Sequence, residues 1–89
     1  KEFINPIIKN METNKQLTFK DLSKCPEDKQ KDLQNIINNI NETIEGLSEH
    51  INQIKTNKLS ITDSIKSQIN ESNDDLTNLN KMFNNIYEH

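Results

Sequence analysis

The feature that most constrains the fold is a run of Ile and Leu residues spaced alternately by four and three positions. The run consists of Leu33, Ile37, Ile40, Ile44, Leu47, Ile51 and Ile54. This heptad spacing places apolar side chains along one stripe of an α-helix, and such a stripe is buried against neighbouring helices. Asn, Glu, Ser and Thr fill most of the positions between, so the rest of the helix is polar. We call this stripe, together with the second run described next, the seam.

A second run follows nearer the C-terminus, and it contains Ile65, Ile69, Leu76, Leu79, Phe83 and Ile86, with Ser72 at one seam position. Counting in sevens from Ile37, Ile44 and Ile51 reaches Lys58, Ile65, Ser72, Leu79 and Ile86. The local spacing of the second run instead places that heptad position at Ile69, Leu76 and Phe83, so the two registers differ by four residues. One continuous helix with a stutter would produce this offset. A turn between the two runs would leave the registers independent.

The start of the first long helix is marked by Pro26. Proline fits the first helical turn, where its missing N–H has no helical partner. Glu27 and Asp28 follow it and place negative charge at the positive end of the helix dipole. A helix is therefore expected to begin near residue 26.

The segment between the two runs favours a turn over a continuous helix. Asn57 is suited to end a helix in the left-handed conformation, and Ser60 with Asp63 resembles a capping box. The sequence thus predicts an all-α fold, an antiparallel helical hairpin with helices over about 26–56 and 61–88 that packs as a coiled coil or helical bundle.

Residues 1–25 are predicted to form a short helix and a connector ahead of the hairpin unit, which comprises residues 26–89. Asn5 is the expected N-cap and Pro6 the first helical residue. The apolar residues of this helix share one face: Ile4, Ile7, Ile8 and Met11. The stretch 12–24 loses the periodicity and is expected to form the connector.

A hairpin of this size buries too little apolar surface to be stable alone, since small domains bury only about 60% of the surface that their unfolded chains expose. A third layer is expected from the N-terminal segment, from a second copy or from another chain. Ile at both core positions of the heptad favours three- or four-stranded packing. We therefore expect a homo-oligomer of hairpins or a bundle with another coiled-coil protein as the partner.

Charge and motif content argue against several other functions. The net charge is −3, with eleven lysines spread among fourteen acids, so no nucleic-acid partner is expected. No apolar run is long enough for a membrane span. Cys25, His50 and His89 have no metal-ligand spacing, and we expect no metal, cofactor, small-molecule ligand or enzymatic activity.

The cellular location is left open by the sequence. A single cysteine mildly favours a reducing, intracellular compartment. Asn41-Glu42-Thr43 and Asn70-Glu71-Ser72 match the N-glycosylation pattern and would suit an extracellular one. Asn, Ile and Lys supply 39 residues, and Ala, Val, Arg and Trp are absent, which indicates an AT-rich genome.

Two stretches resemble known families. Residues 17–44, LTFKDLSKCPEDKQKDLQNIINNINETI, resemble the entry into the coiled-coil region of FG-repeat channel nucleoporins, which implies scaffold assembly through helical bundles. Residues 69–87, with the pair Met82 and Phe83, are similar to the early half of a syntaxin-type SNARE motif, which implies a membrane-fusion or tethering helix. A helical surface protein of a parasite with an AT-rich genome is a further alternative. Our main expectation is a non-catalytic assembly segment.

Overall fold

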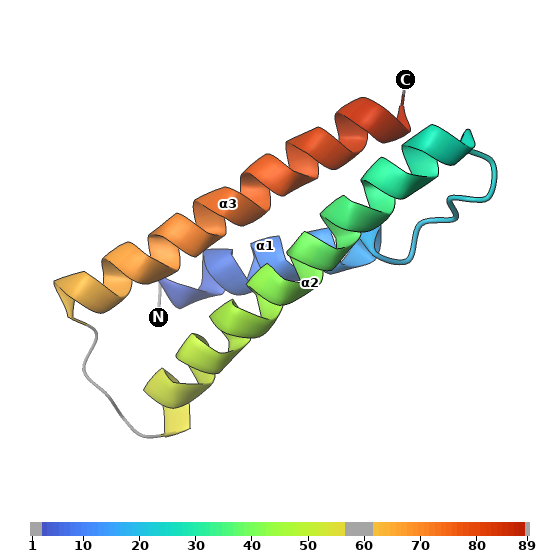
Figure 1. The fold of residues 1–89 in the computed structure, drawn as a ribbon. Helices are drawn as coiled ribbons and strands as arrows, with labels where there is room; N and C mark the ends of the chain where they lie inside the picture. The colour runs from blue at the N-terminus through green and yellow to red at the C-terminus, as the bar shows by residue number, and fades with distance from the viewer. Residues whose placement is uncertain (1–2, 57–61, 89) are drawn as a thin grey trace.

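The protein is built from three α-helices in the residues that the structure, a computed structural model, describes, namely 3–56 and 62–88. Helix α1 spans Ile4–Leu17, α2 spans Glu27–Thr56 and α3 spans Asp63–Tyr87 (Figure 1). No strand occurs within these two ranges. The molecule measures 47 × 19 × 18 Å, and the prediction of an all-α fold is confirmed.

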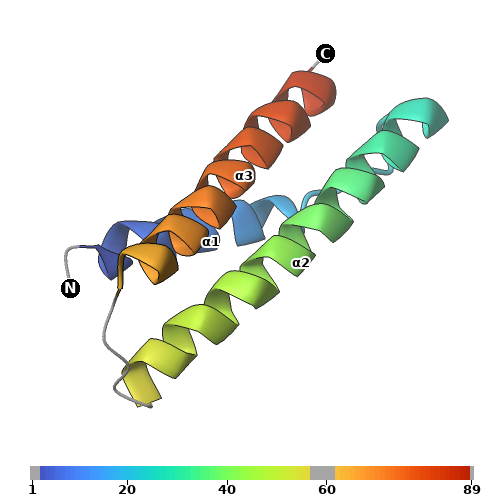
Figure 2. The same cartoon turned by 60° about the vertical axis from the view of Figure 1, so that its left-hand side comes forward.

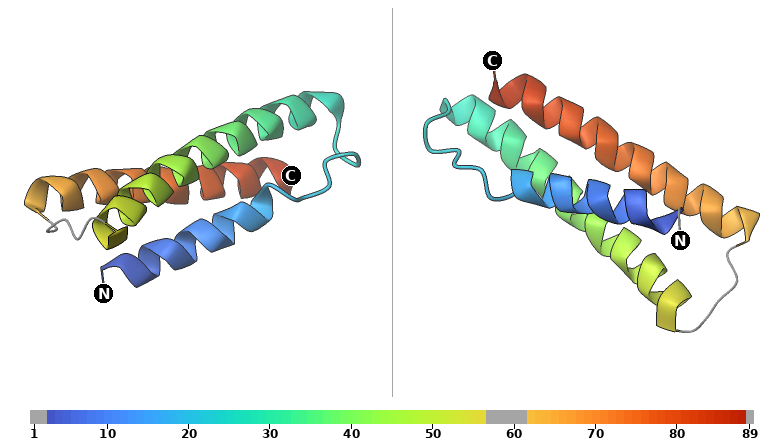
Figure 3. Two further views of the ribbon diagram at one scale, coloured as in Figure 1. Left: turned by 90° about the horizontal axis from the view of Figure 1, so that it is seen from below. Right: turned by 180° about the vertical axis from the view of Figure 1, so that it is seen from behind.

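Helices α2 and α3 run antiparallel and pack along their length (Figures 1 and 3). This confirms the helical hairpin, and the alternative of one continuous helix is wrong. Of the expected turn signals, Asn57 and Ser60 lie outside the described residues. The N-cap of α3 is Thr62, whose hydroxyl oxygen accepts a hydrogen bond from the backbone N–H of Ile65 at 3.2 Å.

The start of α2 is close to the predicted position. The carbonyl of Pro26 accepts a hydrogen bond from the N–H of Gln30 at 2.9 Å, and Glu27 and Asp28 occupy the first turn. The helix continues through Gly46 without interruption. A Cβ atom at position 46 would meet nothing within 4 Å.

Helix α1 crosses the α2–α3 pair obliquely (Figure 2). It runs in the same direction as α3, since Phe3 lies beside Lys66 and Asn10 beside Asn73. Its N-cap is Phe3, which makes no side-chain capping hydrogen bond. The prediction that Asn5 caps this helix was therefore wrong, because Asn5 lies inside the first turn.

Helix α1 is also longer than the sequence suggested, since residues 12–17 continue it where a connector was expected. The physical reason is the burial of Asn14 and Leu17 against the other helices. Asn14 lies seven residues after Ile7, on the buried stripe of the helix. An amide at a position usually held by an apolar residue concealed the periodicity.

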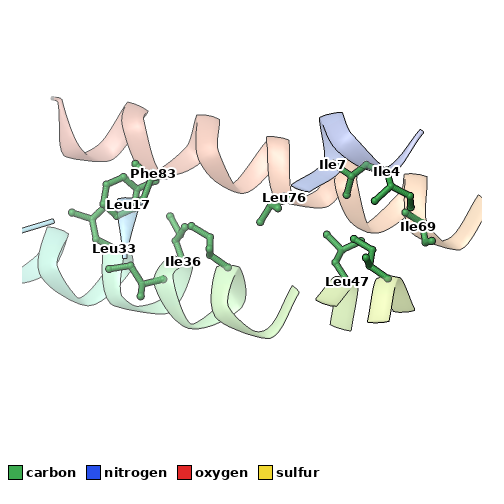
Figure 4. Packing of buried hydrophobic residues seen from close by; sticks show 12 residues of the cluster. Ile4, Ile7, Leu17, Leu33, Ile36, Leu47, Ile69, Leu76 and Phe83 are labelled. Carbon is green, nitrogen blue, oxygen red and sulfur yellow. The ribbon is translucent and has the colours of Figure 1, made fainter. Parts of the chain in front are cut away.

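The hydrophobic core lies between the three helices (Figure 4). Its centre is formed by side chains from α2 and α3 that have no exposed surface, and these are Leu33, Ile40, Leu47, Ile69, Leu76 and Phe83. Helix α1 adds Ile4, Ile7 and Leu17. Of the three expected sources of a third layer, the N-terminal segment of the same chain supplies it.

The connector between α1 and α2 is held at the C-terminal end of α3 by Tyr87. The Tyr87 hydroxyl donates a hydrogen bond to the carbonyl of Asp21 at 3.3 Å. Its ring stacks on Phe83 at 5.5 Å between centroids, and the Lys20 ammonium lies 5.3 Å from its centroid. These contacts fix the path by which the chain returns from α1 to α2.

Candidate interaction surface

The thirteen predicted seam residues fall into two groups in the structure. Eight are buried in the intramolecular core, and they are Leu33, Ile37, Ile40, Leu47, Ile51, Ile69, Leu76 and Phe83. Five keep part of their surface exposed while packing against that core, and they are Ile44, Ile54, Ile65, Leu79 and Ile86. Only the second group has surface left for contact with another molecule.

Helix α3 carries two parallel columns of seam residues. The first column is fully buried and contains Ile69, Leu76 and Phe83. The second is half-buried and consists of Ile65, Ser72, Leu79 and Ile86, which we call the outer column. Ile65, Ser72 and Leu79 each lie four residues before a member of the buried column. This spacing is the register offset of four residues noted in the sequence.

The outer column lies on the side of α3 turned away from α1. Helix α1 contacts α3 through Lys66, Asn73 and Thr77. At 3.6 residues per turn, Lys66 and Asn73 lie on one side of the buried column of α3, and the outer column lies on the other side. The outer column is therefore left uncovered by the third helix.

A shallow groove of about 330 Å³ lies between α2 and α3, and it includes one residue of the outer column. Its lining residues are Asn39, Glu42 and Thr43 from α2, and Asp75, Asn78, Leu79 and Met82 from α3. We call it the α2–α3 groove. Met82 is 49% exposed and lies beside the half-buried Leu79 in this groove, so the two apolar side chains are adjacent.

The α2–α3 groove is acidic as well as partly apolar. Glu42 and Asp75 are both exposed, and among the described residues no lysine lines the groove. Lys15 and Lys66 are on the side of the molecule that α1 occupies: the Lys15 ammonium donates to Asn41 Oδ1 at 3.2 Å, and Lys66 lies 5.7 Å from the Phe3 ring centroid. The groove therefore has a negative rim.

A second group of polar side chains joins α1 to α3, and sequence analysis missed it. Asn10 Nδ2 donates to Asn73 Oδ1 at 2.8 Å and to the hydroxyl of Thr77 at 3.2 Å. Asn14 Nδ2 donates to the backbone carbonyl and to Oδ1 of Asn10, at 2.8 and 3.0 Å. Asn14 has no exposed surface, and its Oδ1 accepts no hydrogen bond from the described residues.

Ile36 is a further core residue that the seam pattern did not include. It is only 5% exposed, although it falls outside the alternating steps of four and three. The available signal was the pair Ile36 and Ile37, which widens the apolar stripe of α2.

Cys25, His50 and His89 were the residues considered for metal or nucleophilic chemistry. Cys25 and His50 are half-buried at different places, and His89 lies outside the described residues. In the parts of the chain that the structure describes, no group of three or more His, Cys, Asp or Glu side chains is arranged to hold a metal ion. Asn41 and Asn70 of the glycosylation patterns are exposed.

Among the described residues, the carboxyl group of Asp21 has a perturbed pKa. The hydroxyl and the backbone N–H of Ser23 donate to Asp21 Oδ1 at 2.7 and 3.0 Å. These hydrogen bonds stabilise the charged form and lower the pKa of Asp21 below its ordinary value, the hydroxyl having the larger effect. The group belongs to the connector and takes no part in the α2–α3 groove.

Comparison with known proteins adds no relative, because no protein-family model, curated protein or solved structure matches the chain. The resemblances of residues 17–44 to channel nucleoporins and of residues 69–87 to SNARE motifs remain predictions. Within 3–56 and 62–88, no helix combines the length and the apolar character needed to cross a bilayer.

Proposed function

We propose that the chain is a non-catalytic assembly segment, a three-helix unit that joins further helices into a larger bundle. The added helices belong to other copies of the chain or to other coiled-coil proteins. The observation that supports the proposal is the half-buried outer column of α3, which borders the α2–α3 groove next to the exposed Met82.

A further helix would cover apolar surface that the single chain leaves exposed. Full burial of a Leu, Ile or Met side chain contributes about 1.5–3 kcal/mol. Leu79, Met82 and Ile86 keep part of that surface in contact with water. A helix laid over them would remove that surface from water, in the way that amphipathic helices bind grooves between two helices.

Assembly through this surface does not compete with the fold of the single chain. The eight buried seam residues already pack against one another with α1 as the third layer. The proposal therefore assigns association to the outer column and the groove, and it assigns the rest of the seam to intramolecular stability.

Sedimentation equilibrium over a range up to high micromolar concentration tests the proposal, first on the chain alone and then with amphipathic helical peptides. We expect either self-association or uptake of a peptide, and we expect Met82→Glu to abolish it. Phe19→Glu is the matched control, because Phe19 is 72% exposed and lies in the connector outside the groove. A folded monomer that takes up no helix would refute the assembly function.

A further inference from the structure

We infer that the α2–α3 groove binds a basic amphipathic helix of another protein, in preference to a second copy of this chain. This inference rests on the proposed assembly function and names the partner of the same surface. It is carried by the combination of an exposed apolar floor and a negative rim in one groove.

The floor of the groove matches the apolar stripe of a helix. Leu79 is half-buried and Met82 is 49% exposed, and Thr43 faces them from α2 across the groove. The methionine side chain is flexible and adapts to the shape of an apolar partner. The outer column extends this surface from Ile65 to Ile86, about 31 Å at 1.5 Å per residue, which matches a partner helix of about 20 residues.

The rim of the groove selects the charge of the partner. Glu42 and Asp75 lie on opposite walls, so a helix seated between them has one acid on each side. Glu71 is exposed one turn before Asp75 and continues the acidic wall along α3. Lysine or arginine on both flanks of the apolar stripe would pair with these acids, and complementary charge of this kind increases association rate and specificity.

The same rim argues against a second copy as the occupant. Twofold-symmetric dimers bring the same surface patch of both molecules together. Two α2–α3 grooves placed face to face would bring Glu42 and Asp75 of one copy near the same acids of the other. No lysine is among the described residues that line the groove, and Lys15, which lines a neighbouring hollow with Glu42, lies on the side of α2 that faces α1. Like charges placed together in an interface oppose binding.

The test uses two synthetic peptides that share one leucine stripe and differ only in their flanks, lysine in one and glutamate in the other. Fluorescence anisotropy measures the Kd of each with the complete chain. We expect the lysine-flanked peptide to bind at least about tenfold more tightly at low salt. This advantage should shrink at about 1 M salt, where the Debye length is about 3 Å.

Two double variants separate the rim from overall charge, because each removes two negative charges. Glu42→Gln with Asp75→Asn should reduce the preference for the lysine-flanked peptide several-fold. Glu12→Gln with Glu45→Gln is the matched control, since both of these acids are exposed and lie outside the groove. The control should retain the preference, and circular dichroism verifies that every variant keeps its helices.

The outcomes distinguish this inference from the proposed function. Equal affinity for both peptides, or equal loss in the two double variants, would overturn the basic-helix partner and leave the assembly function standing. Self-association that Met82→Glu abolishes, without any preference for the lysine-flanked peptide, would replace the partner by a second copy. A monomer that binds neither peptide would overturn both.

Discussion

Replacing Asn14 with Leu should raise the free energy of unfolding by about 2 kcal/mol, although the substitution removes hydrogen bonds. The two side chains have the same branching and the same number of heavy atoms. Leu at this fully buried site contributes about 1.5–3 kcal/mol of hydrophobic stabilisation. Removing the buried Asn14 Oδ1, which accepts no hydrogen bond, adds about 1–3 kcal/mol of stability. Losing the two hydrogen bonds to Asn10 costs about 1 kcal/mol each.

Thermal and urea unfolding followed by circular dichroism measure this change. A gain of about 2 kcal/mol corresponds to a rise in Tm of about 8–16 °C for a domain of this size. Asn70→Leu is the matched control, because Asn70 is exposed in the interior of α3 and reports only the difference in helix propensity. If Asn14→Leu stabilises the protein no more than Asn70→Leu, the argument about the buried amide is refuted.

Three further predictions concern local features. Gly46→Ala should stabilise the protein by about 1 kcal/mol in urea unfolding, because α2 passes through this residue and a methyl group meets no neighbour; a loss of stability would contradict the continuous helix. Thr62→Ala should cost about 1 kcal/mol by removing the acceptor for the N–H of Ile65, whereas Thr62→Ser should retain most of the stability. Ser23→Ala should raise the pKa of Asp21 in an NMR titration, since the hydroxyl hydrogen bond is the main cause of its lowered value. In the unmodified protein, the stabilisation from the Asp21 carboxylate is complete above the unfolded-state pKa and is lost as the pH falls through the lowered folded-state pKa. If the pKa of Asp21 is unchanged in Ser23→Ala, the Ser23 hydroxyl is not the cause of the lowered value.

The two long helices were predictable because each carries an apolar pattern over many turns. The predicted ranges 26–56 and 61–88 correspond to Glu27–Thr56 and Asp63–Tyr87. Pro26 marked the start of α2, since its ring fits only the first turn. Patterns of this length indicate helices reliably, because each added turn repeats the same spacing.

Helix α1 was predicted only in part because its pattern contains a polar residue at a core position. A hydrophobic pattern is recognised from apolar residues alone, so the polar Asn14, although buried, made the stripe appear to end at Met11. The hydrogen bonds from Asn10 to Asn73 and Thr77 depend on the packing of α1 against α3, and nothing near residue 10 indicates it. Long-range polar contacts of this kind are set by tertiary structure.

The apolar residues of the candidate surface could be identified from the sequence, but their exposure to solvent could not. The seam pattern identified Leu79 and Ile86 together with fully buried residues such as Leu76. Which of them keep exposed area depends on the side of the α2–α3 pair that α1 covers. The acidic rim at Glu42 and Asp75 likewise requires two helices to be placed side by side.

The parallel placement of α1 on α3 has a consequence for how the chain folds during synthesis. Asn10 and its partner Asn73 are separated by 63 residues, whereas α2 and α3 are joined by a short segment. At about 5–20 residues per second, the ribosome adds Asn73 roughly 3–13 s after Asn10. The part of the α1 partner surface that α3 supplies is therefore absent until then. Because closing a short loop costs less entropy than closing a long one, the contacts of neighbouring helices should form first and those between α1 and α3 last.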